Sequence, residues 1–264
     1  MNSSEFRLCV FMFFFLSFAL LEIFCSYRKR IYTKRDRWFG NIGLTLISNI
    51  LIKLTVPLGL VSFADYFKEA GWGLFNSIDL HSGLVLFLSV VVLDLAIYAQ
   101  HVFFHKIPFF WKLHRVHHAD VDLDVTSALR FHPLEILVSI GYKALIVLVI
   151  GASPESVLTF EIILSTMAMF NHSNLHIPQK VECFLRLLVV TPQMHIIHHS
   201  VDQSESDMNF GFNLSVWDRL FGTYINDFST NGRVGQLYYR SKQEHKLKEI
   251  LLLPFLTVKE EKKS

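Results

Sequence analysis

The 264-residue chain is 52% hydrophobic and only 18% charged, with 25 phenylalanines and a mean hydropathy of +0.37. This composition excludes an ordinary soluble domain, in which about a quarter of the residues are charged. The formal net charge of +2 does not indicate a nucleic-acid partner, because membrane topology explains the basic excess. We therefore expect a polytopic membrane protein.

Five segments are candidate membrane spans, for which roughly 20 apolar residues are needed. They are residues 8–25, 42–63, 84–98, 134–150 and 157–170. Several are short or contain a charge, so the sequence predicts four to five crossings. Lys53 has no evident partner in the second segment. Lys143 and Glu161 lie at similar distances from the turn at 151–154, which predicts a structural ion pair, with contact to a substrate as the alternative.

The first segment, residues 8–25, resembles a secretory signal only superficially. No basic region precedes it, and no small-residue cleavage site follows it. The run RKRIYTKRDR at 28–37 follows instead, and the positive-inside rule keeps such a run cytoplasmic. We expect an uncleaved first helix with an outer N-terminus. Cys9, Cys25 and Cys183 form no plausible disulfide framework, since the first two lie about 24 Å apart along a helix.

Histidines recur in four groups. They are HVFFH (His101, His105), HRVHH (His114, His117, His118), HSNLH (His172, His176) and HIIHH (His195, His198, His199). Residues at i, i+3 and i+4 share a helix face, so each group can direct two or three imidazoles at one point. With five crossings, all four groups lie on the cytoplasmic side.

These imidazoles are too many for one ion, since a tetrahedral zinc takes four protein ligands at most. Two metals with about five nitrogens each would keep an open position for oxygen, as octahedral non-haem iron does. Val102 stands where an H-E-x-x-H metalloprotease has its glutamate, which argues against peptide hydrolysis. One such pair at a membrane interface is usually incidental, but four groups together predict a metal site.

Three further histidines stand apart from the groups. His132 is alone before Pro133 and is either a ligand, a partner of a ligand ring, or a helix-entry contact. We expect His81, in an outer loop, and His245, in the C-terminal tail, to be ordinary surface residues.

Metal-bound histidines usually donate their second ring N–H to a nearby acceptor. Asp94 is a candidate, because Asp94, Tyr98, His101 and His105 form one helical stripe; the alternative is an ion-paired residue at a helix end. The other candidate partners of ligand rings are Tyr98, His132, Asp120, Glu135, Asp207 and Asn209. We expect Asp122 and Asp124 to be solvated loop residues.

The four histidine groups, followed by DMNFGFNLSVWDRLFGTY at 207–224, resemble the fatty acid hydroxylase/sterol desaturase superfamily of integral-membrane di-iron enzymes. The resemblance covers roughly residues 84–226. It implies an all-α membrane helix bundle with a cytoplasmic histidine-rich helical cap, two iron ions, and O2 as co-substrate. The ligands implied by the matching motifs are His101, His105, His114, His117, His118, His172, His176, His195, His198 and His199.

The reaction implied by the resemblance is hydroxylation of an unactivated C–H bond of a lipid. Members of this superfamily also include desaturases with the same histidine groups, so lipid or sterol desaturation is the alternative. A non-catalytic metal or haem membrane protein is a remote third. A sterol, a fatty acyl chain, an ether lipid and a carotenoid remain equal substrate candidates.

Electrons must come from outside the chain, which has no glycine fingerprint for flavin or nicotinamide and no cysteine cluster. The resemblance implies a cytochrome b5-like protein or a ferredoxin as donor. The expected location is a bacterial inner membrane or the endoplasmic reticulum.

The chain divides into three predicted regions. Residues 1–83 form N-terminal transmembrane helices and loops, 84–226 the catalytic domain, and 227–264 a cytoplasmic C-terminal tail. Within the catalytic region, we expect 207–224 to support the site structurally rather than to close over it. The short segment 183–190 is predicted to be an interfacial helix that lies on the membrane.

Overall fold

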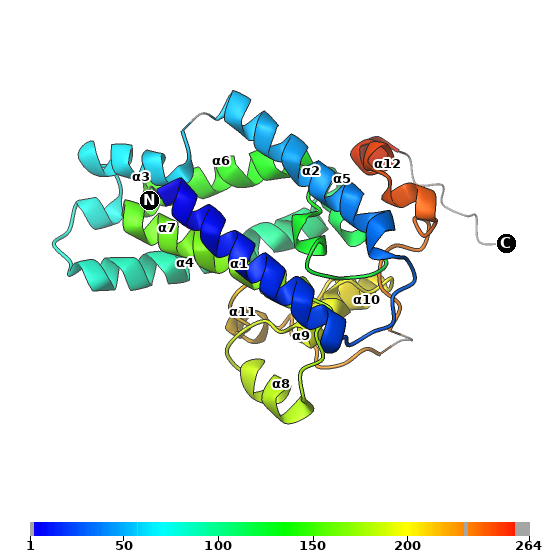
Figure 1. Cartoon of the computed structure of the whole chain (residues 1–264). Coiled ribbons are helices and arrows are strands. Elements are labelled where there is room, and N and C mark those ends of the chain that lie inside the picture. Colours follow the sequence, from blue (N-terminus) through cyan, green and yellow to red (C-terminus); the bar gives the residue numbers. More distant parts are fainter. Residues whose placement is uncertain (1–2, 57, 230–231, 257–264) are drawn as a thin grey trace.

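A computed structural model describes residues 3–56, 58–229 and 232–256 of the chain (Figure 1). Within these residues it contains helices and isolated β-bridges but no strand, which confirms the predicted all-α class. Its five long helices are α1 (Ser3–Phe24), α2 (Lys34–Thr55), α4 (Ser82–Lys106), α6 (Pro133–Ile150) and α7 (Pro154–His172). In this bundle α7 packs between α1 and α4, and α6 packs between α4 and α2.

The short helices gather mainly at the end of the bundle away from the N-terminus (Figure 1). They are α5 (Pro108–His118), η2 (Ser127–Leu129), α8 (Gln179–Leu185), α9 (Pro192–His198), α10 (Gln203–Ser206), α11 (Val216–Leu220), η3 (Lys242–His245), α12 (Leu247–Leu252) and η4 (Leu253–Phe255). Two others, α3 (Leu60–Glu69) and η1 (Leu74–Asn76), lie at the opposite end.

Four helical stretches of the described chain are long and apolar enough to cross a membrane, which agrees with the predicted four to five. They are Ser4–Phe24, Lys34–Glu69, Ser82–Lys106 and Pro133–Ile150. The fifth predicted segment, 157–170, is helical within α7 but does not reach that hydropathy.

The predicted second span, 42–63, is divided between two helices. Helix α2 ends at Thr55 and α3 begins at Leu60. Val56 precedes a proline in the sequence, and a residue in that position is biased away from the α conformation. Pro57 itself lies outside the described residues. Lys53 is exposed in the last turn of α2, where a cation complements the helix dipole.

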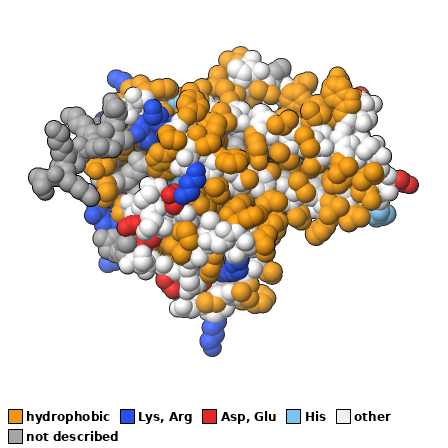
Figure 2. All heavy atoms as spheres, turned by 180° about the vertical axis from the view of Figure 1, so that it is seen from behind, with side chains coloured by type: hydrophobic (Ala, Val, Ile, Leu, Met, Phe, Trp, Pro, Cys, Tyr) orange, Lys and Arg blue, Asp and Glu red, His pale blue; other side chains and the backbone are white. Residues whose placement is uncertain are grey.

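The outer faces of the long helices are apolar. Phe13 is 65% exposed, Leu16 59% and Phe39 75%. Figure 2 shows hydrophobic side chains covering much of the bundle, while most charged side chains lie toward the end formed by the short helices. An exposed apolar surface of this extent is typical of a protein surrounded by lipid.

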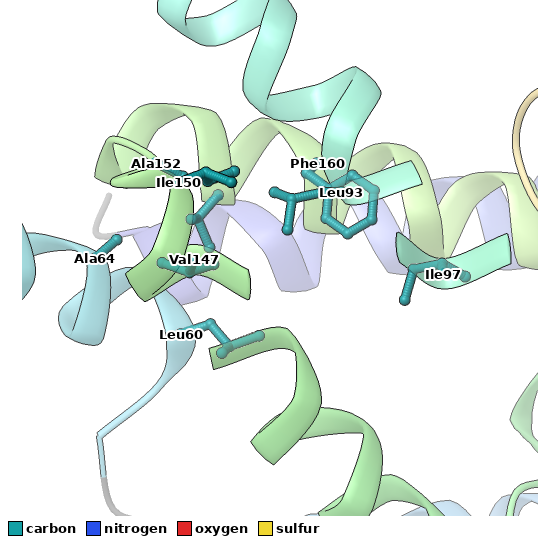
Figure 3. Close-up of a cluster of buried hydrophobic side chains, with 9 residues drawn as sticks. Leu60, Ala64, Leu93, Ile97, Val147, Ile150, Ala152 and Phe160 are labelled. Atoms are coloured by element: carbon teal, nitrogen blue, oxygen red, sulfur yellow. The ribbon is translucent and has the colours of Figure 1, made fainter. Parts of the chain in front are cut away.

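A compact core joins α3, α4, α6 and α7 at the end remote from the short helices (Figure 3). Its buried members are Leu60, Ala64, Leu93, Ile97, Val147, Ile150, Ala152, Val157 and Phe160. Gly151 ends α6 with a backbone in the left-handed region, at φ 68°. The loop before α4 packs closely on this turn, since a Cβ added to Gly73 would lie 2.4 Å from the Cα atom of Gly151. This hairpin makes α6 and α7 antiparallel, so the start of α6 and the end of α7 meet at the histidine end.

The predicted ion pair between Lys143 and Glu161 does not form. Glu161 pairs instead with Arg7 of α1 at 2.7 Å. Among the described residues, Lys143 has no ion pair within 4.0 Å. The sequence placed the two helices of the hairpin correctly but gave no indication that α1 packs against α7 and supplies a nearer cation.

The loop between α5 and α6 is buried, contrary to the prediction for Asp122 and Asp124. Arg37 of α2 pairs with Asp120 at 2.5 Å and with Asp124 at 2.7 Å, and all three side chains are fully buried. Asp122 accepts the backbone N–H groups of Ile31 and Tyr32. The basic run after α1 therefore folds over this loop. Burial alone would raise the pKa of Asp120, but the neighbouring Arg37 guanidinium outweighs this effect and holds that pKa well below its usual range.

The described part of the C-terminal region packs back onto α2 and α5. His245 is fully buried, which corrects its predicted surface location; its Nδ1 lies 3.3 Å from Nη1 of Arg130. A Cβ on Gly40 would lie 2.3 Å from the carbonyl oxygen of His245, so only glycine permits this approach. Residues 257–264 lie outside the described part of the predicted tail. His81 is exposed, as expected, and caps α4 by accepting the N–H of Gly83.

The segment predicted as an interfacial helix at 183–190 is helical only in its first part. Helix α8 ends at Leu185, and Arg186 turns back to pair with Glu182 at 2.5 Å. The apolar side chains of Phe184 and Leu188 are 64% and 62% exposed. All three cysteines are free and exposed.

Candidate metal centre

Local sequence signals place the two HxxHH motifs at the ends of short helices. Pro108 stands in the first turn of α5, where its fixed φ favours helix initiation. Thr191 caps α9 by accepting the N–H of Met194 at 3.2 Å, and Pro192 follows it. Each helix therefore presents its histidines toward its C-terminal end, where α5 packs against α4 and α9 packs against α7.

The structure gathers most of the predicted ligands into two adjoining groups of buried rings. The first group is His101, His105, His114, His118 and His198, and the second is His117, His172, His195 and His199. Within each group the ligand atoms lie within 4.8 Å of one another. The adjacent residues His117 and His118 join different groups, because successive helical side chains point about 100° apart.

His176 and His132 lie outside both groups. Helix α7 ends at His172 and continues into an extended Ser173, so the i,i+4 spacing no longer brings His176 to the same face. His176 is exposed, with its ring 6.1 Å from that of Tyr27. His132 caps α6, and its Nε2 lies 3.3 Å from the carbonyl oxygen of Leu251. Neither position supports a role as a metal ligand.

The donor geometry fits metal ions. Neighbouring Nε2 atoms lie 3.2, 3.1, 2.9 and 3.0 Å apart in the pairs 101–114, 105–118, 117–172 and 172–195. Two nitrogens bound at a right angle to one ion at about 2.1 Å would be about 3 Å apart. Hydrogen bonding alone fits poorly, since both ring nitrogens of His199 lack a partner among the described residues.

The electrostatics of the groups favour neutral rings. Burial lowers the pKa of His114 to about 3 and that of His172 to about 4. Burial, reinforced by neighbouring histidines, also holds the pKa of His118 well below its usual range. A neutral imidazole is the form that binds a metal, so the site is prepared for ligation near neutral pH.

Several rings are oriented by a hydrogen bond from Nδ1. His114 donates to Glu135 at 2.7 Å. The remaining acceptors are backbone carbonyls: Phe210 for His101 and Met208 for His198, both at 2.8 Å, and Ala168 for His172 at 2.7 Å. Each bond leaves Nε2 free to face its group. The sequence named Glu135 only as one of several acceptors, and it carries no signal for the carbonyls.

Asp207 is a second predicted partner that lies next to a histidine ring of the site. Its carboxylate is 3.4 Å from Nδ1 of His105 and pairs with Lys106 at 2.8 Å. Asn209, at φ 54°, binds the backbone of Ile225 and Met194 rather than a ring. Asn209 is thus a turn residue beside the site.

Asp94 and Tyr98 share the predicted stripe but hydrogen-bond to no histidine ring. Asp94 accepts from Trp217 Nε1 at 2.8 Å, and the Tyr98 hydroxyl lies 2.9 Å from that of Thr223. These contacts fasten the 207–224 segment to α4. The segment therefore has the supporting role predicted from its sequence.

Asp218 fixes the part of this segment that carries the His101 acceptor. Its carboxylate accepts the N–H groups of Phe210 at 2.7 Å and Gly211 at 2.8 Å, and burial raises its pKa to about 6. A Cβ on Gly211 would lie only 2.6 Å from this carboxylate. Asp218 was not among the residues that the sequence predicted to take part in the site.

Two cavities approach the histidine groups from different sides. One of about 280 Å³, here called the bundle cavity, lies between the long helices and is lined by His101 and His114 of the first group. The other, of about 170 Å³ and here called the basic cavity, reaches His172 of the second group. Its charged lining residues are Arg28, Lys29, Arg30, Asp122, Arg233 and Arg240.

The fold and the site together define a membrane-spanning helix bundle with paired clusters of buried histidines at one end. The chain belongs to the fatty acid hydroxylase family, whose model matches residues 86–223. No solved structure matches it significantly.

Three relatives have been named for their activities. The ornithine lipid hydroxylase OlsE of Rhizobium tropici is 24% identical, over 79% of this chain and 63% of that protein. Human alkylglycerol monooxygenase is 25% identical, over 80% of this chain and 46% of that protein. Human cholesterol 25-hydroxylase is 22% identical, over 83% and 81%. The chain therefore spans less than two-thirds of the length of the first two relatives.

Proposed function

We propose that the protein is a membrane-bound di-iron oxygenase that uses O2 to hydroxylate an unactivated C–H bond of a lipid. The observation that carries this proposal is a cavity between membrane helices that ends on a group of buried, neutral histidines. Family membership supports it, and so do the three relatives named as lipid-modifying hydroxylases or monooxygenases. Residues 84–226 are proposed as the catalytic domain, flanked by 1–83 and by the tail 227–264.

Each histidine group would hold one iron, which would supply the binding and reduction of O2. The proposed ligands are the nine histidines of the two groups. The second group has one histidine fewer than the first, and His176 is left out of the set because of its position. All-imidazole coordination leaves net positive charge at the centre and suits Fe(II).

The residues of the bundle cavity would bind and orient the lipid. Phe104, Phe131 and Leu164 supply apolar wall next to His101 and His114, so an alkyl chain there is held beside the first group and shielded from water. Glu135 and the carbonyl of Phe210 keep the two rings fixed. Specificity for one C–H bond then follows from how far the alkyl chain of the lipid extends into the cavity.

Hydroxylation consumes two external electrons and two protons, so that one oxygen atom enters the C–H bond and the other leaves as water. We propose a cytochrome b5-like protein or a ferredoxin as the electron donor. The basic cavity supports this, because its lining carries five cations against Asp122 and would attract an acidic partner close to His172. The same basic residues favour a cytoplasmic location of the histidine end.

Desaturation at the same site is the second candidate, favoured by the same histidine groups. The two reactions differ in the product, which gains one oxygen or loses two hydrogens, so mass spectrometry of the lipid product separates them. A haem or non-catalytic metal protein is the remote alternative, and a Soret band would reveal haem.

The first test is the metal content and absorption spectrum of protein purified from iron-supplied cells. We expect about two irons per chain without a Soret band, one ion for each histidine group. His198→Ala should lower the iron content and abolish turnover, whereas the matched control His176→Ala should retain both. Full iron and turnover in His198→Ala, or bound haem, would refute the proposed centre.

A further inference from the structure

Three charged side chains meet inside the bundle at a distance from the histidines. Arg7 of α1, Lys143 of α6 and Glu161 of α7 all line the bundle cavity. Arg7 and Glu161 form an ion pair at 2.7 Å. Lys143 has no such partner among the described residues, so the cluster holds two cations against one anion.

The cluster and the histidines stand at separate places along one cavity. Glu135, which accepts the hydrogen bond of His114, lies in the first turn of α6, and Lys143 follows eight residues later on the same helix. At about 1.5 Å per residue, this places Lys143 about 12 Å further into the bundle. A ligand that contacts Lys143 can therefore extend along α6 toward the first histidine group.

A polar group without a partner also lines the cavity. Gln100 is only 6% exposed; its Oε1 accepts from Ser139 at 3.2 Å, but its Nε2 has no partner among the described residues. Buried polar atoms are rarely left in this state, so a polar ligand that accepts from the Gln100 amide is a physical explanation.

A purely structural role explains the Arg7–Glu161 pair but not Lys143. A lone ammonium between membrane helices is costly and is usually retained for a function. A single negative charge on a ligand would complete the cluster and leave it neutral.

We propose that Lys143 binds the anionic group of a lipid substrate, either a carboxylate or a phosphate ester, while the alkyl chain extends toward His101 and His114. This inference rests on the proposed function, because it takes the histidine end as the place of reaction. Binding of the anionic group at Lys143 then determines which carbon of the alkyl chain lies next to the first histidine group. The position of hydroxylation is therefore a fixed number of carbons from the charged end of the lipid.

Binding of four probes with the same alkyl chain tests the proposal on the purified, iron-loaded full chain. The probes are palmitate, hexadecyl phosphate, neutral hexadecanol and cationic hexadecylamine. We expect at least one anion to bind about tenfold more tightly than hexadecanol, and hexadecylamine to bind most weakly. Which anion is preferred distinguishes a carboxylate from a phosphate ester.

Variants assign this preference to the cluster. Lys143→Met, similar in length but uncharged, should reduce the preference to about twofold or less, and Lys143→Arg should keep most of it. Glu161→Gln removes the anion of the cluster and should increase the preference. Lys53→Met is the matched control, because Lys53 is an exposed lysine of another membrane helix.

Three outcomes would overturn the inference: equal binding of hexadecanol and both anions, an undiminished preference in Lys143→Met, or no binding of any probe. If Lys143→Met does not fold, Glu161→Gln decides, because an unchanged preference there contradicts the proposed charge balance. Iron content reports separately on the proposed function. Protein with two irons but no anion preference would refute the anchor alone, whereas protein without iron would refute the oxygenase.

Discussion

The residue that connects the bundle cavity with the histidines is Glu135. Its side chain is 2% exposed, and it accepts the Nδ1 proton of His114 while also lining the bundle cavity. A carboxylate in this position fixes the ring and makes its other nitrogen a stronger electron donor. Under the proposed function, Glu135 thus prepares His114 for metal binding without itself touching the ion.

Replacing Glu135 should therefore weaken metal binding without removing a ligand. We expect Glu135→Ala to lower iron affinity about 10- to 100-fold, the usual effect of losing such a partner. Glu135→Gln should lose less, because its amide oxygen can accept the same proton. Iron retention in a chelator titration measures both, and Glu155→Ala, at an exposed acid at the start of α7, is the control. Equal retention in Glu135→Ala and the control would contradict the role.

At this scale, histidine spacing predicted only part of how the rings are grouped. His117 and His198, the i+3 members of HRVHH and HIIHH, lie in the opposite group from the other two members of their motif. The i,i+4 spacing did predict a shared group for His114 and His118, and for His195 and His199. It failed for His176, because α7 ends at His172. The stripe through Asp94 and Tyr98 predicted a shared face correctly, but a stripe does not identify what packs against it, and here that is the 207–224 segment.

Among the elements, the C-terminal segment from η3 to α12 depends on one buried histidine. His245 contacts Arg130 and packs its ring 5.2 Å from that of Tyr32, while α12 lies against α2. Burial, aided by the positive charge of Arg130, lowers the pKa of His245 to about 4. The docked segment therefore requires the neutral ring.

This arrangement predicts a loss of stability in mild acid. In the unfolded chain His245 is protonated near its ordinary pKa of about 6.5, whereas in the folded chain it stays neutral down to about pH 4. The free energy of unfolding is therefore highest above about pH 6.5 and falls as the pH decreases toward 4. At pH 5 the loss is about 2 kcal/mol. Thermal unfolding at pH 7 and pH 5 measures it, and His245→Asn should show a smaller difference in midpoint. An identical pH dependence in the variant would rule out His245 as the cause.

Long-range packing explains the elements that the sequence did not predict. Residues 120–124 read as a solvated loop because of their aspartates, but Arg37, more than 80 residues earlier, neutralises two of them in the interior. The division of the second span, by contrast, has a local signal in the sequence, because Val56 precedes a proline, although hydropathy alone continues across the break. Composition shows that a segment is apolar or charged, whereas its partner depends on the tertiary fold.

For the whole molecule, the orientation in the membrane is a prediction. The basic run at 28–37 and the basic cavity lie at the histidine end, and the positive-inside rule places that end in the cytoplasm. The loop between α3 and α4 is at the other end of the bundle (Figure 1). Both ends of the bundle carry exposed residues, so chemical labelling can determine which end faces the cytoplasm.

Cysteine labelling tests this orientation. Cys25 and Cys183 are exposed at the histidine end, so a membrane-impermeant maleimide should label them in broken membranes but not in intact cells. Ser77→Cys, placed at an exposed position of the outer loop in a chain without Cys9, Cys25 and Cys183, should be labelled from outside. The reverse pattern would place the histidine groups on the outer side.

The division of α9 between the two histidine groups has a consequence for biosynthesis. His198 completes the first group, and His195 and His199 complete the second. A nascent chain that has not yet emerged from the ribosome as far as α9 holds four rings of the first group and two of the second. Both histidine groups are therefore completed together and late, after the long helices have been synthesised. Under the proposed function, the synthesis of this seven-residue helix decides when the chain becomes able to bind iron.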